Sequence, residues 1–250
     1  MERPYKVPHG NNMPVQAPVF DNPTVPYSCP NLKTLTAYCR TTPEMIQKYL
    51  EPTPFEYVSD QFVVSISDFG NASNGSFYDV GIIIPVKYKD VVGGYYMFEY
   101  ENTTWSCIAG RELWGYPKKF AEASLVEEDG KITATVTKDG VDLIQLKMDL
   151  SEQLDHPIPA VQIYPHLLLY TLPRPDGPGI LTQMVLSRDT SPDFVTKSRL
   201  EAPISVELNG LPNDPLDEFQ PVEVLGGTYV IGDFHATEEN GWAKILNKLI

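Results

Sequence analysis

Apolar positions in this chain recur mostly every second residue, which is the period of a β-strand rather than of a helix. From Gln61 onward the runs "QFVVSISDF", "VGIIIPVKYK" and "GGYYMFEYEN" are rich in the valine, isoleucine and aromatic residues that strands favour. Further runs of this kind are "HLLLYTLP", "ILTQMVLSR", "APISVEL" and "VEVLGGTYVIGDF". The pattern predicts a mainly β fold.

Tight turns divide one stretch into three strands. The segment "SLVEEDGKITATVTKDGVDLIQLKMDL" contains the pairs Asp129-Gly130 and Asp139-Gly140 between strand-like runs. Asp-Gly is favoured in two-residue hairpin turns because both of its positions must adopt positive φ. The segment therefore predicts an antiparallel meander.

Two short segments have helical spacing instead. In "TTPEMIQKYLEP", Thr42 is placed as an N-cap, Pro43 lies in the first turn and Pro52 follows the end, so a short helix is predicted. The C-terminal "NGWAKILNKLI" also predicts a helix, which would dock its apolar stripe on the core. This stripe consists of Trp242, Ile245, Leu246 and Leu249.

The order of these elements predicts the architecture. No repeat of constant length and no polar linker divides the chain. We therefore expect one domain over residues 1–250, of class mainly β with peripheral α-helices. Its strands would form a single, strongly curved antiparallel sheet or a β-barrel.

Composition excludes several classes of protein. The 250 residues are 42% hydrophobic, which is enough to bury a core. Acidic residues outnumber basic ones 33 to 19, so the chain lacks the basic surface of a nucleic-acid binder. The N-terminal residues contain no apolar run typical of a signal peptide or membrane helix, so we expect no membrane partner and a cytoplasmic location.

Familiar catalytic and metal-binding motifs are missing from the sequence. The four histidines lie far apart, and no nucleophile elbow, Walker loop or dinucleotide fingerprint occurs. Cys29, Cys39 and Cys107 form no C-x-x-C pair, so neither a disulfide framework nor a metal site is predicted. His166 is interpreted as a core or turn histidine rather than a ligand.

One feature that suggests chemistry is the lysine doublet in "GRELWGYPKKF", residues 110–120. Lys118 and Lys119 can be solvated strand residues that discourage edge-to-edge pairing. A lysine whose proton is easily lost can instead act as a nucleophile towards carbonyl carbon. The pattern alone leaves both interpretations open.

The neighbours of the doublet suggest how such an amine is activated. Pro117 gives a rigid entry to a strand, and Trp114 and Tyr116 can make the surroundings apolar. An ordinary lysine has a pKa near 10.4, so about 3 to 4 units of lowering would be needed, and burial can supply a shift of that size. The adjacent Lys119 ammonium can be a second cause of this lowering. If the two lysines continue a regular strand, their side chains face opposite ways, desolvation must dominate and Lys119 would act weakly, through a salt bridge elsewhere.

The stretch "AGRELWGYPKKF" closely resembles the signature of the acetoacetate decarboxylase superfamily, an example long used for lysine activation. The resemblance extends to "IPVKYKDVVGGYY", "LLLYTLPRPDG" and "DPLDEFQPVEVLGGTYV", and so covers most of the chain. It implies the β fold of that family, catalysis without metal or organic cofactor, a small oxo-acid substrate and assembly into homo-oligomers.

Roles can be carried over by position. Lys118 resembles the Schiff-base nucleophile and Lys119 its companion, while Asp79 occupies the place of an active-site glutamate. Two family residues are replaced: Leu32 falls where the family has an arginine, and Val64 falls where it has a second glutamate. These replacements predict a cavity that is larger in apolar area and poorer in charge, suited to a longer β-keto acid or a 2-oxo acid.

The remaining pocket residues come from the motif itself. Glu112 can transfer protons, but we favour a pair with Arg111 that braces the loop. Tyr116 and Trp114 are expected to line the pocket. The predicted function is a lyase that decarboxylates a β-keto acid through an iminium ion on Lys118. Alternatives are a Schiff-base aldolase, dehydratase or cyclase acting on a 2-oxo acid, and a ligand-binding member without turnover.

Overall fold

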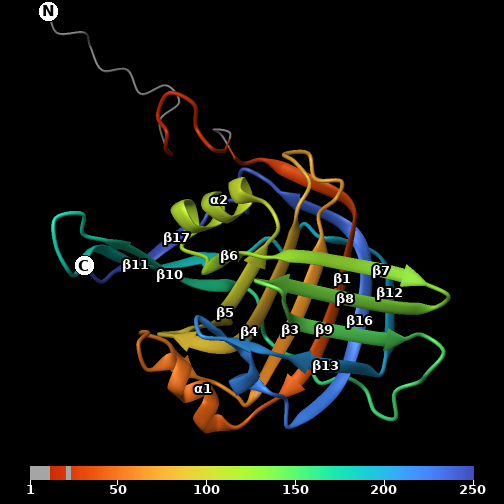
Figure 1. Ribbon diagram of the computed structural model, residues 1–250. Helices are drawn as coiled ribbons and strands as arrows, with labels where there is room; N and C mark the ends of the chain where they lie inside the picture. Colours follow the sequence, from red (N-terminus) through yellow and green to blue (C-terminus); the bar gives the residue numbers. More distant parts are fainter. Residues whose placement is uncertain (1–11, 21–23) are drawn as a thin grey trace, which may run out of the picture.

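The computed structural model of this chain describes residues 12–20 and 24–250. Strands dominate and helices are few, which confirms the predicted mainly β class. Figure 1 shows two packed layers of strands, with α1 and α2 at their periphery. Lys118, Lys119 and Asp79 lie on strands of the larger layer.

The larger layer is an eleven-stranded mixed sheet. In spatial order its strands are β12 (Val195–Ala202), β16 (Glu223–Ala236), β1 (Tyr27–Arg40), β3 (Gln61–Asp68), β4 (Tyr78–Tyr88), β5 (Val91–Glu101), β10 (His166–Pro173), β11 (Ile180–Arg188) and β17 (Lys244–Lys248), with β2 (Glu56–Tyr57) beside β4 and β6 (Lys118–Phe120) beside β5. The sheet is open, with β12 and β17 at the ends of the described path, and β5 pairs in parallel with β6 and β10. The sequence predicted one antiparallel sheet or a barrel, whereas the structure has an open sheet with both parallel and antiparallel pairs.

The smaller layer is a four-stranded antiparallel sheet. Its strands are β13 (Ile204–Leu208), β9 (Val141–Asp149), β8 (Lys131–Lys138) and β7 (Glu122–Glu128), and a short hairpin of β14 (Gly210–Leu211) and β15 (Asp214–Pro215) follows β13. The predicted meander is confirmed. Asp129 and Asp139 have φ values of 49° and 51°, and the glycine after each is also positive, as this kind of turn requires.

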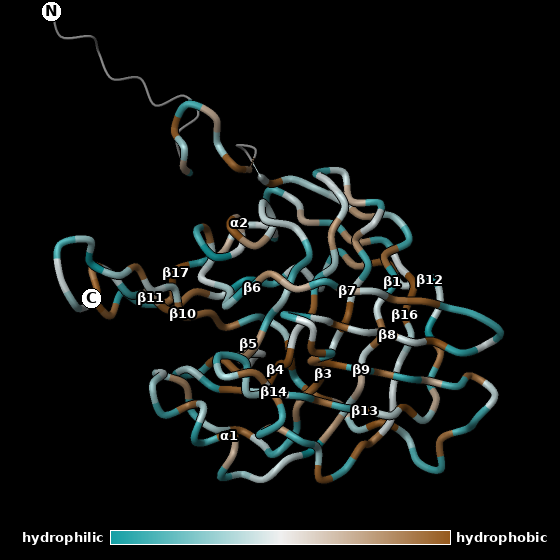
Figure 2. Tube along the Cα trace, in the orientation of Figure 1, coloured by the Kyte–Doolittle hydropathy of each residue, from teal (hydrophilic) through white to brown (hydrophobic). Residues whose placement is uncertain are grey.

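The main hydrophobic core lies between the two layers. Val64 and Ile82 from the larger sheet are fully buried there, with Ile132 and Leu146 from the smaller sheet in the same cluster. Figure 2 shows hydrophobic positions concentrated along these central strands. Because strand side chains alternate between faces, the opposite face of β1, β3, β4 and β5 remains available for a second set of residues.

Three helical segments lie among the described residues. The predicted first helix is confirmed as α1 (Pro43–Leu50), in which the Thr42 side chain accepts a hydrogen bond from the Met45 amide at 3.3 Å. The second, α2 (Thr104–Trp114), was not predicted, and it ends at Gly115 with φ of 74°. The third is the 3-10 helix η1 (Leu216–Phe219). Within the described residues, no helix is long and apolar enough to cross a membrane.

The unpredicted helix explains the parallel pairing. A tight hairpin joins only antiparallel strands, whereas a parallel neighbour requires a crossover connection. Here α2 is that connection, and it returns the chain so that Lys118 pairs with Glu99 and Phe120 with Glu101.

The C-terminal helix prediction is wrong. Residues 244–248 form β17, which pairs with β11 in an antiparallel register that includes Leu186 opposite Ile245. A short isolated helix is only marginally stable, whereas the free edge of β11 offers backbone hydrogen bonds. The helical spacing of the apolar residues is therefore overridden by strand pairing.

Candidate active site

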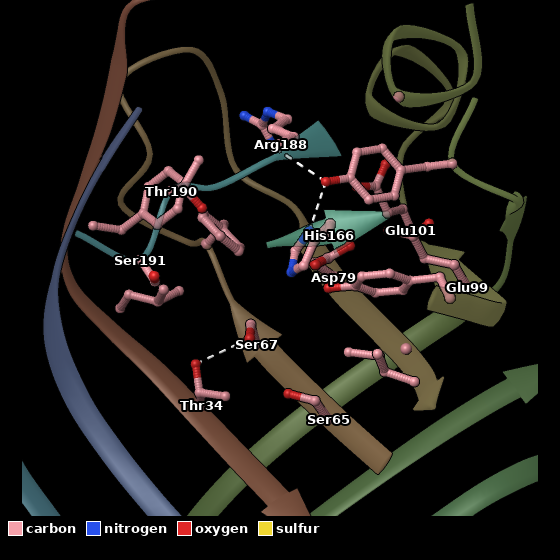
Figure 3. Close-up of a pocket in the computed structure, with 18 of the residues that line it drawn as sticks. Thr34, Ser65, Ser67, Asp79, Glu99, Glu101, His166, Arg188, Thr190 and Ser191 are labelled. Atoms are coloured by element: carbon pink, nitrogen blue, oxygen red, sulfur yellow. Dashed lines mark hydrogen bonds between the residues drawn. The ribbon is translucent and has the colours of Figure 1, made fainter. Parts of the chain in front are cut away.

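A cavity of about 450 Å³ lies on the face of the larger sheet that points away from the main core. Its floor comes from β1, β3, β4 and β5, and its walls come from α2, the segment before β10 and the end of β11. Figure 3 shows labelled side chains from β1, β3, β4, β5, β10 and the end of β11 around it. The volume falls in the range of small-molecule sites.

Lys118 brings an amine into this cavity. Its Nζ lies 3.2 Å from Oδ1 of Asp79 and 3.2 Å from Oε1 of Glu99, and it forms a still shorter ion pair with Glu101. The side chain of Lys118 is 11% exposed, and those of both glutamates are 1% exposed. One ammonium group therefore faces three carboxyl groups with little access to water.

This environment sets the proton balance of the cluster. Burial alone lowers the pKa of the Lys118 amine, but the charges of Asp79, Glu101 and Glu99 together hold it well above its usual range. Burial also raises the pKa of Glu99 well above normal and that of Glu101 to about 7, against the opposing effect of Lys118. Carboxyl groups in this cluster therefore retain protons near neutral pH.

The expectation of a dry, uncharged pocket with a depressed lysine pKa is thus wrong. The two predicted replacements do not make the cavity poor in charge, because Glu99 and Glu101 supply carboxyl groups from β5. Desolvation favours a neutral amine, but three carboxyl groups at ion-pair distance outweigh it. The amine can become neutral by passing its proton to one of these carboxylates.

Lys119 points to the other face of β6. Its Nζ lies 2.8 Å from Oδ1 of Asp214, a fully buried carboxylate that also accepts a hydrogen bond from the Tyr100 hydroxyl at 2.8 Å and pairs with Lys138. Lys119 is not among the described residues that line the cavity. The alternation expected for two successive strand residues therefore separates the doublet.

Gly110 of α2 leaves room for the Lys118 side chain. A Cβ atom at Gly110 would come within 2.4 Å of Cε and 2.5 Å of Cδ of Lys118, closer than real Cβ contacts allow. Arg111, the next residue, donates a hydrogen bond from Nη1 to the Lys118 carbonyl at 3.0 Å. The end of α2 therefore fixes both the backbone and the side chain of the lysine.

A second polar group lies beside the amine. The Tyr116 ring centroid is 5.1 Å from the Lys118 Nζ, and the Tyr116 hydroxyl is 2.7 Å from Nδ1 of His166. The Nη1 atom of Arg188 donates to the same hydroxyl at 3.4 Å. Burial, with the charges of Arg188 and Lys118, lowers the pKa of His166 to about 3, so its ring is neutral.

Other sequence candidates divide between the cavity and elsewhere. Trp114 and Leu32 line the cavity, as expected from the sequence. Val64 does not: it is fully buried in the main core, because its neighbour Ser65 takes the cavity face of β3.

Two motif residues also lie outside the cavity. Glu112 and Arg111 are exposed on α2 and are not among its described lining residues. No Arg111–Glu112 ion pair occurs among the described residues. Arg111 instead stabilises the start of β6 through its hydrogen bond to the Lys118 carbonyl. The helix that was not predicted turns both side chains outward.

Sequence reasoning missed Glu99, Glu101, His166 and Arg188. A pattern in "YYMFEYEN" could have indicated the first two, because acidic residues two positions apart in an apolar strand share one face. Arg188 and His166 are paired across β10 and β11, and this long-range pairing left no local pattern.

The walls of the cavity differ in chemistry. On the floor, Thr34 and Ser67 hydroxyls lie 2.9 Å apart and those of Thr36 and Ser65 lie 3.2 Å apart. Aromatic side chains form another part of the lining: Phe69, Phe77, Trp105, Phe194 and Phe234. The cavity can therefore hold a substrate larger than a four-carbon acid, with both polar and apolar parts.

Comparison with known proteins defines the class. The model of the acetoacetate decarboxylase family matches residues 12–245, so the chain belongs to that family. The fold and the buried lysine at the end of the "GRELWGYPKK" motif agree with this membership.

Particular relatives make the similarity concrete. The acetoacetate decarboxylase of Paraburkholderia phytofirmans is 28% identical over 227 residues, covering 88% of this chain and 87% of the relative. The crystal structure of acetoacetate decarboxylase from Legionella pneumophila is similar with a TM-score of 0.81 at 19% identity, covering 100% of this chain and 99% of that one. The family match and the name of the Paraburkholderia relative support a lyase.

A third similar structure is the enduracididine biosynthesis enzyme MppR in complex with the condensation product of pyruvate and imidazole 4-carboxaldehyde. Its TM-score is 0.74 at 14% identity, and the match covers 98% of this chain and 99% of that chain. At this identity the similarity concerns the fold alone.

Proposed function

We propose that this protein is a Schiff-base-forming lyase that decarboxylates a β-keto acid through an iminium ion on Lys118. The observation that carries the proposal is the Lys118 amine, which lies in a largely buried cavity within reach of three carboxyl groups. Family membership supports the same reaction class. Neither a metal nor an organic cofactor is needed for this chemistry.

Proton transfer within the cluster would start the reaction. The Lys118 ammonium passes a proton to the Glu101 carboxylate, and the neutral amine adds to the substrate ketone. The resulting carbinolamine takes a proton from a carboxyl group and loses water, which leaves an iminium ion. Nearby carboxylates stabilise this cation as they stabilise the ammonium ion.

Loss of carbon dioxide then follows from the iminium. The bond between the α-carbon and the carboxylate breaks, and its electron pair moves to the iminium nitrogen to give an enamine. A carboxyl group of the cluster protonates the α-carbon, and water hydrolyses the new iminium to release the ketone and the amine. The sum is one β-keto carboxylate and one proton converted to a ketone and carbon dioxide.

A second candidate is aldol condensation or dehydration of a 2-oxo acid. It uses the same iminium but retains the substrate carboxylate. Two observations favour it: the cavity is large enough for two joined reactants, and MppR, with the same fold, binds a condensation product of pyruvate and an aldehyde. A ligand-binding member without turnover is the remaining alternative.

Borohydride trapping tests the Schiff base directly. Incubation with acetoacetate, longer β-keto acids or pyruvate followed by reduction should add the mass of the reduced ketone to the peptide that contains Lys118. Lys118→Arg should abolish the adduct, because a guanidinium is not a nucleophile at ordinary pH. Lys119→Arg is the matched control and should retain it, since that side chain faces Asp214.

Product analysis then separates the reactions. Carbon dioxide release from a β-keto acid supports decarboxylation, whereas a condensed product from pyruvate and an aldehyde supports the aldol reaction. If every oxo acid leaves Lys118 unmodified, the protein is a binding member and the catalytic proposal fails.

A further inference from the structure

Arg188, at the end of β11, is a buried cation that the proposed reaction does not use. It is 7% exposed and lies on the wall of the cavity. Its Nε donates to the Gly241 carbonyl at 2.7 Å, its Nη1 donates to the Tyr116 hydroxyl at 3.4 Å, and its guanidinium lies 4.3 Å from the Trp114 ring centroid. All these partners are electrically neutral.

The guanidinium therefore lacks a counter-ion in the described part of the chain. No carboxylate there lies within ion-pair distance of it, and its Nη2 atom has no partner at hydrogen-bond geometry. The other polar side chain that interacts with it is Tyr27, a phenol rather than a carboxylate. A guanidinium carries a positive charge at any ordinary pH. Burying such a charge without a partner is strongly unfavourable, unless a ligand supplies the missing negative charge.

His166 offers a second unpartnered donor at the same wall. Arg188 Nη1 donates to the Tyr116 hydroxyl oxygen, which lies 2.7 Å from Nδ1 of the neutral His166 ring. We assign the hydroxyl as the donor to Nδ1, because its own hydrogen then has an acceptor in this buried site. The remaining proton of the ring is then on Nε2, which has no partner among the described residues. Two buried donors, one of them charged, thus line one wall of the cavity (Figure 3).

We propose that Arg188, assisted by His166, binds a carboxylate of the oxo-acid substrate, and that this carboxylate is retained through the reaction. The position of the ketone at Lys118 rests on the proposed function. The cavity then has two ends: an amine among carboxyl groups, and a guanidinium without a counter-ion, with the Tyr116 ring between them.

The bound carboxylate is a retained one for an energetic reason. A charge-assisted hydrogen bond to Arg188 would stabilise a departing carboxylate most in the ground state, before its charge is lost to carbon dioxide. Such an interaction would slow decarboxylation. Arg188 therefore suits the distal carboxylate of a dicarboxylic β-keto acid, or the carboxylate of a 2-oxo acid in a condensation.

Two ketones with the same five-carbon chain test this inference. Levulinate carries a carboxylate two methylene groups from its ketone and cannot decarboxylate through the iminium, while methyl propyl ketone has a methyl group in that place. Borohydride trapping on Lys118 should reach half-labelling at about tenfold lower concentration of levulinate than of methyl propyl ketone, as one charge-assisted hydrogen bond predicts. Pentanoate should compete with levulinate, and pentanol should not.

Variants assign this preference to the residue. Arg188→Met should remove the preference while labelling by methyl propyl ketone continues, which also shows that the cavity is intact. Arg188→Lys keeps a charge without the paired donors and should give an intermediate preference. Arg174→Met is the control, since Arg174 is exposed and pairs with Asp176, and it should behave as the native protein does.

The inference is overturned if the native protein labels equally well with both ketones, or if Arg188→Met lowers thermal stability yet keeps the preference, since Arg188 is then only a structural brace. If neither ketone labels Lys118, the proposed function fails. Calorimetry of pentanoate binding then tests carboxylate binding by Arg188 separately. If pentanoate binds the native protein and binds Arg188→Lys more weakly, carboxylate binding by Arg188 is supported. If pentanoate does not bind the native protein, it is rejected.

Discussion

At the scale of single residues, the protonation of Lys118 is set by the carboxyl groups around it as well as by desolvation. Three carboxyl groups surround its amine, and burial keeps protons on Glu99 and, near neutral pH, partly on Glu101. The amine and these carboxyl groups titrate as one interacting cluster. Removing one of these groups must therefore change the pKa values of the others.

The first prediction concerns Glu101→Gln. Removing a carboxylate from contact with the ammonium disfavours the charged amine, so the pKa of Lys118 falls. A contact pair of charges is worth roughly 4 kcal/mol at an effective dielectric of 20, so we expect a decrease of about one unit or more. The pH dependence of Lys118 acylation by an activated ester, followed by mass spectrometry of the peptide, measures this pKa.

A matched control comes from the motif itself. Glu112 is exposed outside the described lining of the cavity, so Glu112→Gln should leave the acylation profile unchanged. An identical profile for Glu101→Gln and the native protein would contradict the role given to Glu101.

The sequence indicated the lysine but not its surroundings. Lys118 was recognisable from an eleven-residue motif, and the separation of Lys119 followed from strand alternation. Glu99 was overlooked although its spacing from Glu101 was visible, and its contact with Lys118 depends on a parallel pairing; Arg188 lies on a strand far along the chain and left no local pattern. Local patterns specify side-chain direction, whereas contacts between distant strands require the fold.

At the scale of elements, a buried carboxylate ties β6 to both layers. Asp214 of β15 accepts from Lys119 of β6 and Tyr100 of β5, and it pairs with Lys138 of β8. Although burial raises its pKa, the hydrogen bonds from Lys119, Lys138 and Tyr100 hold the pKa of Asp214 below its usual range. The group therefore stabilises the fold at neutral pH and loses this contribution as the pH falls below its folded-state pKa.

The prediction at this scale is that Asp214→Asn destabilises the protein at neutral pH. It leaves two lysines facing a neutral amide, and breaking a buried ion pair costs about 3 to 5 kcal/mol, less here because the lysines are partly exposed. We expect a loss of about 2 to 3 kcal/mol in the free energy of unfolding, measured with urea.

The control for this prediction is a surface pair. Glu56 lies 3.7 Å from Lys87 and both are largely exposed, so Glu56→Gln should change the free energy of unfolding by less than about 0.5 kcal/mol. If the two substitutions change the free energy of unfolding equally, Asp214 does not stabilise the fold more than a surface carboxylate does.

Element prediction succeeded where local chemistry was strong. The cap at Thr42 and the two Asp-Gly turns identified α1 and the meander. It failed at α2, which has no side-chain hydrogen bond at its N-cap and contains Gly110, and at β17, where pairing with β11 replaced a helical pattern. The failures occur where tertiary contacts decide the conformation.

At the scale of the whole molecule, β10, β11 and β17 form an arm that extends beyond the packed layers (Figure 1). Several apolar side chains on this arm are exposed: Leu172, Leu181, Ile245 and Ile250. Large exposed apolar patches are uncommon on monomers. This observation supports the proposal, first made from the family resemblance, that the chain forms homo-oligomers.

The last prediction tests that assembly. The native protein should have a solution mass above that of one chain by light scattering, and Leu181→Lys combined with Ile245→Lys should shift it towards the monomer. Val126→Lys is the control, because Val126 is 52% exposed on β7, away from the arm. A monomeric native protein, or an unchanged mass for the double variant, would refute this use of the arm.

The two neighbouring lysines of β6 also fix how that short strand aligns with β5. If the strand slid by one residue, either Pro117 or Phe120 would occupy one of the two lysine positions. One acidic group, either the carboxyl groups around Lys118 or Asp214, would then lose one lysine partner. Only one alignment gives a lysine of β6 to both acidic groups, so the doublet favours a single register for this three-residue strand.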